Sequence, residues 1–118
     1  MKTILLVDDD PLLLDALAAL VAAGGYAVCR AGDGAEALRR ARAYAPTVIV
    51  TDYMMPIMSG EALVRALARD PALANIPVVL SSAIAAPPPD LPIAAFLRKP
   101  FAAERLLALL HQHSVGRS

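Results

Sequence analysis

The residues in this chain that are best suited to chemistry are carboxylates and one lysine. Three consecutive aspartates, Asp8 to Asp10, stand near the start of the chain, and Asp52 stands alone near its middle. Lys99 is one of two lysines against nine arginines, which indicates that its position needs a compact ammonium charge. Carboxylates that are brought together repel one another, and a bound hard cation keeps them ionised. Oxygen ligands with room for water favour Mg²⁺.

A carboxylate held beside Mg²⁺ and a lysine is a nucleophile toward phosphorus, because the cations neutralise the oxygens of the transferring group. The product of this chemistry is an aspartyl phosphate. It requires that Asp8 to Asp10, Asp52 and Lys99 meet in space, although they are far apart in the sequence. The helices and strands of the fold must therefore bring these distant residues together at one place.

Short apolar runs precede these polar residues. They show no alternation of polar and apolar residues, which is typical of parallel strands buried on both faces. A weaker fifth run is predicted to be an edge strand. The four strong runs are Ile4 to Val7, Val48 to Val50, Val78 to Leu80 and Ala94 to Leu97, and the weaker one is Tyr26 to Arg30.

Segments with helical spacing separate most of these runs. The first follows Asp10, a suitable N-cap residue, and carries on one face Leu13, Leu17, Leu20 and Val21. Single helices between strands predict right-handed crossovers and a doubly wound α/β fold, whose ligand site lies at the carboxyl ends of the strands. The other expected helices cover about Gly34 to Tyr44, Ser59 to Asp70 and Ala103 to His113.

The crossover between the fourth and fifth strands is expected to differ. Only Ala83 to Ile93 are available for it, and four of these residues are prolines, Pro87, Pro88, Pro89 and Pro92. Each proline inside a helix costs about 3 kcal/mol. We therefore expect the fourth helix to be shortened or replaced by a polyproline-like loop that leaves the sheet near Phe96 partly uncovered.

Length and composition set wider bounds. A chain of 118 residues with 58% hydrophobic residues predicts one domain, 1–118, with a flexible tail from about residue 114. The formal net charge of +0 disfavours direct binding to nucleic acid. The single cysteine, Cys29, favours a cytoplasmic location, and no segment resembles a membrane span or a secretory signal.

Three motifs together resemble the receiver domains of chemotaxis-type response regulators in two-component signalling. They are Leu5 to Asp10, Val50 to Pro56 with Ser59-Gly60, and Arg98 to Phe101. The resemblance covers nearly the whole chain. It implies a flavodoxin-like, five-stranded parallel sheet with strand order 2-1-3-4-5.

The resemblance also implies roles for individual residues. Asp52 would accept a phosphoryl group, Lys99 would pair with a phosphoryl oxygen, and the Lys99-Pro100 peptide would be cis. Ser82 would bond the phosphoryl group in the active state, and the rotamer of Phe96 would follow that hydroxyl. The Mg²⁺ ligands would be Asp8 through water, Asp9, Asp52 and the backbone carbonyl of Met54.

In this interpretation the chain is a phosphorylation-dependent switch and not an enzyme, since its chemistry is confined to its own phosphoryl transfer and dephosphorylation. The implied phosphoryl donor is a sensor histidine kinase or a histidine phosphotransfer protein. A homodimer or a downstream protein is the implied output partner.

Two other interpretations remain open on the sequence. Asp8 and Asp10 have the separation of the aspartates in phosphohydrolases of the haloacid dehalogenase type, although Leu12 stands where that family has Thr or Val. A degenerate receiver that acts only as a binding module is the second alternative. Asp10 itself has two interpretations, a metal contact or a helix N-cap.

Overall fold

Residues 1–84 and 86–115 are described by the computed structural model of the chain. The five expected strands form one parallel sheet with the order β2-β1-β3-β4-β5, which confirms the predicted topology. The strands are β1 (Thr3–Val7), β2 (Ala27–Ala31), β3 (Val48–Asp52), β4 (Val78–Ser82) and β5 (Ala95–Arg98).

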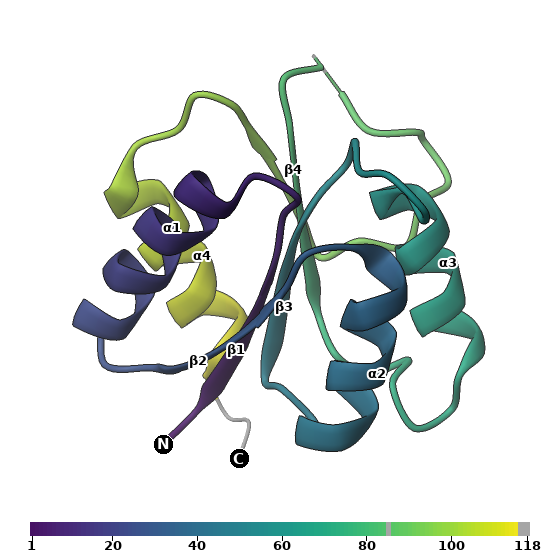
Figure 1. Ribbon diagram of the computed structural model, residues 1–118, viewed down its shortest axis with the longest axis horizontal. Coiled ribbons are helices and arrows are strands. Elements are labelled where there is room, and N and C mark those ends of the chain that lie inside the picture. Colours follow the sequence, from purple (N-terminus) through teal and green to yellow (C-terminus); the bar gives the residue numbers. More distant parts are fainter. Residues whose placement is uncertain (85, 116–118) are drawn as a thin grey trace.

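Helices cover both faces of this sheet, as Figure 1 shows. One apolar cluster lies between the sheet and α2 and α3, and a second lies between the sheet and α1 and α4. No helix in the described part of the chain is both long and apolar enough to cross a membrane. The helices are α1 (Pro11–Ala23), α2 (Gly34–Tyr44), α3 (Gly60–Arg69) and α4 (Ala103–Ser114).

Local signals explain where the helices begin. Asp10 caps α1, since its carboxylate accepts hydrogen bonds from the backbone N–H groups of Leu12 and Leu13 at 3.0 and 3.3 Å. Asp33 caps α2, and Ser59 caps α3 through the N–H of Ala62. These caps satisfy backbone donors that have no partner inside a helix. The structure therefore supports the capping interpretation of Asp10.

The buried face of α1 differs from the predicted one. The residues buried against the sheet are Leu14, Ala18 and Val21, whereas Leu17 and Leu20 are only half-buried. The helix is apolar on most sides, so its spacing left the phase of the buried face undetermined.

The crossover between β4 and β5 contains no helix among its described residues, 83–84 and 86–94, as the prolines predicted. A turn forms instead, in which the N–H of Leu91 donates to the carbonyl of Pro88 at 3.2 Å. Leu91 is buried and joins the cluster beneath α3, where Phe96 is half-buried. Phe96 thus remains partly exposed, as expected, and the loop supplies Leu91 as a core residue for this face.

Candidate phosphorylation and metal site

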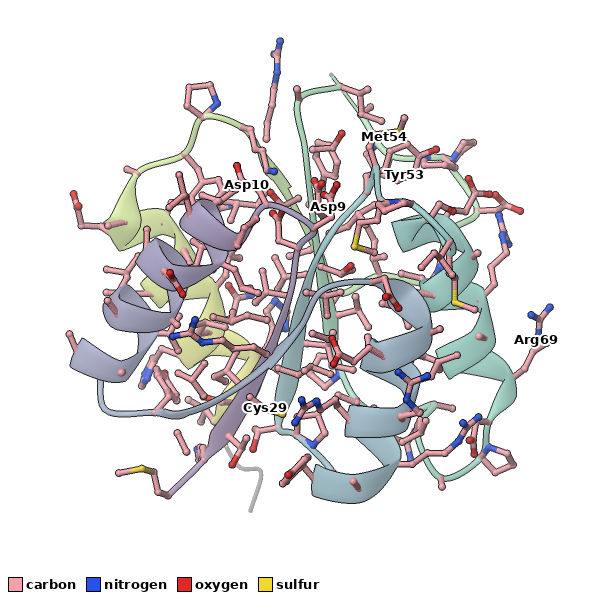
Figure 2. The ribbon with its side chains drawn as sticks, in the orientation of Figure 1. Asp9, Asp10, Cys29, Tyr53, Met54 and Arg69 are labelled. Carbon is pink, nitrogen blue, oxygen red and sulfur yellow. The ribbon has the colours of Figure 1, made fainter. Side chains whose placement is uncertain are left out.

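The carboxyl ends of the central strands meet at one edge of the sheet, and the predicted polar residues lie there. In Figure 2, Asp9, Tyr53 and Met54 lie at the same end of the molecule, in the loops that follow β1 and β3. Carboxylate oxygens of Asp8, Asp9 and Asp52 lie within 4.8 Å of one another. Residues separated by more than forty positions in the chain thus form one acidic cluster.

Lys99 lies against this cluster from the end of β5. Its Nζ donates a hydrogen bond to Asp52 Oδ1 at 3.1 Å and forms an ion pair with Asp8 Oδ2 at 3.6 Å. Burial lowers the pKa of Lys99. The hydrogen bond to Asp52 and the negative charges of Asp52 and Asp8 raise it by more than burial lowers it, so the pKa lies above its ordinary value. The ammonium is therefore charged at neutral pH and compensates part of the acidic cluster.

Asp8 is the most buried member of the cluster, with 4% of its surface exposed. Burial raises the pKa of its carboxyl, against the lowering effects of the N–H of Asp10 and the charge of Lys99. That N–H donates to Asp8 Oδ1 at 2.9 Å and fixes the carboxylate at the end of β1. Asp9, by contrast, is exposed, and Asp52 is partly exposed, so both are accessible from solvent.

The cluster has the chemistry of a divalent cation site. Three carboxylates face a single ammonium, which leaves an excess of negative charge, and their oxygens are hard ligands of the kind that Mg²⁺ prefers. Met54 lies two residues beyond Asp52, and 68% of its surface is exposed, so its side chain is not buried among the carboxylates. The donor set therefore fits Mg²⁺.

The predicted switch residues lie on the neighbouring strands β4 and β5. Ser82 is buried at the end of β4, and its Oγ accepts a hydrogen bond from the N–H of Ile84 at 3.2 Å. Phe96 is half-buried against the cluster that contains Leu80, its partner in the sheet register. The Lys99-Pro100 peptide is cis, as the resemblance implied.

A polar network next to Asp52 was not predicted. The hydroxyl of Tyr53 donates to Glu61 Oε1 at 3.2 Å, and Arg65 bonds both Glu61 and Asp90, at 3.1 and 3.4 Å. The i,i+4 spacing of Glu61 and Arg65 on the expected helix was a usable signal for that pair. The contact with Asp90 depends on the path of the proline-rich crossover, which no local pattern specifies.

Comparison with known proteins decides the family. The family model of the response regulator receiver domain matches residues 4–111 of the chain. The chain belongs to the response regulator receiver domain family. Members of this family are phosphorylation-dependent signalling switches and not conventional enzymes, so the interpretation as a haloacid dehalogenase is set aside.

Individual relatives show where such domains occur. The receiver domain is 42% identical over 84 residues to a gliding motility regulatory protein of Myxococcus xanthus, covering 71% of this chain and 11% of that protein. It is 36% identical over 110 residues to hybrid signal transduction histidine kinase D of Dictyostelium discoideum, covering 89% of this chain and 7% of the kinase. The chain thus spans a small fraction of these two relatives.

A solved structure agrees with the fold. The signal receiver domain of a signal transduction histidine kinase from Syntrophus aciditrophicus superimposes with a TM-score of 0.91 at 29% sequence identity. The match covers 100% of this chain and 95% of that one.

Proposed function

We propose that this receiver domain accepts a phosphoryl group on Asp52 from a phosphohistidine donor. The observation that carries the proposal is the hydrogen bond between Lys99 Nζ and Asp52 Oδ1, inside a cluster that also contains Asp8 and Asp9. Asp52 is the member of this cluster that combines partial exposure with a direct contact to the lysine. It is therefore the carboxylate best placed to act as the nucleophile.

The transfer is a displacement at phosphorus. One Asp52 oxygen forms a bond to phosphorus while the bond between phosphorus and the donor imidazole nitrogen breaks, and the imidazole leaves with that electron pair. Lys99 neutralises the charge of the phosphoryl oxygens. The Ser82 hydroxyl, whose oxygen accepts a hydrogen bond from the N–H of Ile84, then donates its own proton to a hydrogen bond with a phosphoryl oxygen, and the rotamer of Phe96 follows.

The metal in this proposal is Mg²⁺, held by Asp9, Asp52 and the carbonyl of Met54, with Asp8 acting through water. When bound, Mg²⁺ supplies positive charge to the transferring phosphoryl oxygens. Replacing Asp9 with alanine is expected to weaken Mg²⁺ binding and phosphorylation together, and normal Mg²⁺ affinity in that variant would contradict the assignment.

The donor is proposed to be a sensor histidine kinase or a histidine phosphotransfer protein. An apolar groove of about 500 Å³ lies between α1 and the start of α4, and Lys99 contributes to its wall together with Leu13, Leu17 and Phe101. A protein that brings a histidine to Asp52 must cover the surface beside Lys99. This groove is the apolar surface that such a donor would meet.

Labelling with radioactive acetyl phosphate and Mg²⁺ tests the acceptor. The native chain is expected to be labelled, and Asp52→Asn to remain unlabelled. Asp15→Asn is the matched control, because Asp15 is an exposed aspartate on α1 that pairs with Arg30 outside the cluster. Label on Asp52→Asn would overturn the assignment of Asp52.

A further inference from the structure

One buried hydroxyl beside the proposed acceptor has no partner in the described part of the chain. Ser81 is 4% exposed, and its Oγ forms no hydrogen bond there. Every other buried side-chain polar atom in the described residues has a partner or some contact with solvent. An unsatisfied buried hydroxyl is destabilising, so its retention requires an explanation.

The sheet register places Ser81 directly next to Asp52. Ser81 is the Cα partner of Asp52 on the adjacent strand, and the N–H of Tyr53 donates to the carbonyl of Ser81 at 2.9 Å. Strands in a sheet lie about 4.8 Å apart, so paired side chains on one face are close neighbours.

Alternation along the strands shows that Ser81 and Asp52 share a face. Two residues earlier, Val79 and Val50 are paired and both belong to the apolar cluster beneath α1 and α4. Because side chains alternate between faces, Ser81 and Asp52 form the next pair on that same face. Asp8 on β1 lies on the same face by the same alternation. It follows Leu6 by two residues, and Leu6 is paired with Val50.

A polar row therefore lies on an apolar one. Leu6, Val50 and Val79 form an apolar row on this face, and Asp8, Asp52 and Ser81 lie in the row above it, which ends at the apolar Leu97, the partner of Ser81 on β5. Asp8 is held by the N–H of Asp10, and Asp52 by Lys99. Ser81 is the member of the row whose hydrogen-bonding capacity is unused.

We infer that Ser81 is a positioning residue for phosphoryl transfer, whose hydroxyl donates a hydrogen bond to the carboxyl group of Asp52 when the site is loaded. A hydroxyl has one donor that rotates to suit its acceptor, and a neighbouring carboxylate is the acceptor that the register supplies. This bond orients the carboxyl so that its other oxygen faces the phosphorus. The inference rests on the proposed function of Asp52.

Threonine and valine at position 81 give a matched pair, since they have nearly the same shape and differ by the hydroxyl. Affinity for beryllofluoride with Mg²⁺, followed by NMR, and the rate of labelling by acetyl phosphate are the two measurements. Ser81→Val is expected to lose about tenfold in both relative to Ser81→Thr, which is the loss of a hydrogen bond to a charged group. Ser81→Ala, which adds no volume, is expected to lose the same factor relative to the native chain.

Thermal unfolding separates this role from a purely structural one. Because it removes an unsatisfied buried hydroxyl, Ser81→Ala is expected to be at least as stable as the native chain. Its unfolding midpoint should therefore be unchanged or higher, while its rate of labelling by acetyl phosphate falls. Equal beryllofluoride affinity and labelling in the valine, alanine and threonine variants would overturn the inference. The Ser81 hydroxyl would then be interpreted as a hydrogen-bond partner of a buried water molecule and not of Asp52. Absence of label from the native chain would instead refute the proposed function of Asp52.

Discussion

At the scale of single residues, an apolar residue follows each of two site residues on β3 and β4 by two positions. Met54 and Ile84 follow Asp52 and Ser82 by two positions, and 68% and 39% of their surfaces are exposed. Neither side chain can orient an attacking water by hydrogen bonding. This arrangement predicts a slow loss of the phosphoryl group by hydrolysis.

Polar side chains at these two positions should shorten the lifetime of the phosphorylated state. A Met54→Asn, Ile84→Glu double variant is expected to lose the label faster by roughly an order of magnitude, because its side chains can hold and orient water. The measurement is the decay of label after the phosphoryl donor is removed, with each single variant as a control. Unchanged or slower decay in the double variant would contradict this explanation.

Ile57 combines an unfavourable backbone with an exposed side chain. Its φ is 69°, in the left-handed region that β-branched residues avoid, and 83% of its surface is exposed. Asparagine tolerates this region, so Ile57→Asn is expected to stabilise the fold by about 0.5 to 1 kcal/mol. Chemical denaturation measures the change, and Ile57→Val, which keeps the strain, is the control. A loss of stability in Ile57→Asn would show that the isoleucine side chain contributes packing.

At the scale of elements, Gly60 fixes the distance between β3 and α3. A Cβ at this position would overlap the carbonyl oxygen of Asp52 and lie 2.8 Å from the Cα of Tyr53. The N–H of Gly60 also donates to the carbonyl of Tyr53 at 2.8 Å. The start of α3 and the end of β3 are therefore in contact through their backbones.

Gly60→Ala is expected to destabilise the fold by about 2 kcal/mol, since backbone atoms must move to make room. It is also expected to slow the labelling of Asp52, because that movement displaces the acceptor. Gly32→Ala is the control, as its added Cβ meets only Glu36 Oε1, at 3.8 Å. Equal denaturation curves for the two variants would contradict the predicted close contact.

The proline-rich crossover shows what the sequence could and could not predict. Four prolines excluded a regular helix, because each removes a backbone donor and clashes with the preceding turn. The burial of Leu91 depends instead on how the loop folds back over the sheet, and the ion pair of Asp90 with Arg65 depends on the same path. Such contacts between distant residues have no periodic signal.

The same contrast holds for the site. The order of polar residues after apolar runs placed Asp8, Asp9, Asp52 and Lys99 at one edge, because parallel strands align their carboxyl ends. It did not identify which strand positions share a face, so the pairing of Ser81 with Asp52 required the register. The left-handed conformation of Ile57 was also invisible, since isoleucine itself gives no such signal.

At the scale of the whole molecule, the groove between α1 and α4 is the proposed docking surface for the phosphoryl donor. Leu13→Glu places a charge on the wall of this apolar groove, whereas Ala19→Glu changes an exposed residue of the same helix outside the groove wall. Transfer from purified, autophosphorylated histidine kinases is expected to slow about tenfold in Leu13→Glu and to be unchanged in Ala19→Glu. Several purified histidine kinases are first compared, and the one that phosphorylates the native chain fastest is used for this measurement.

Acetyl phosphate separates docking from chemistry in this experiment, because a small donor needs no groove. Both variants are expected to be labelled by acetyl phosphate at the native rate. If Leu13→Glu slowed labelling by the kinase and by acetyl phosphate equally, the groove would be needed for the structure of the phosphorylation site and not for recognition of the donor.

The position of the phosphoryl group can be determined by chemical trapping. Borohydride reduces an aspartyl phosphate to homoserine, which mass spectrometry locates in a peptide. After treatment with a phosphorylated kinase and Mg²⁺, the native chain is predicted to carry homoserine at position 52 and at no other aspartate. Homoserine at position 8 or 9 with Asp52 intact, or phosphate held on a serine or histidine, would contradict the assignment of Asp52 as the phosphoryl acceptor.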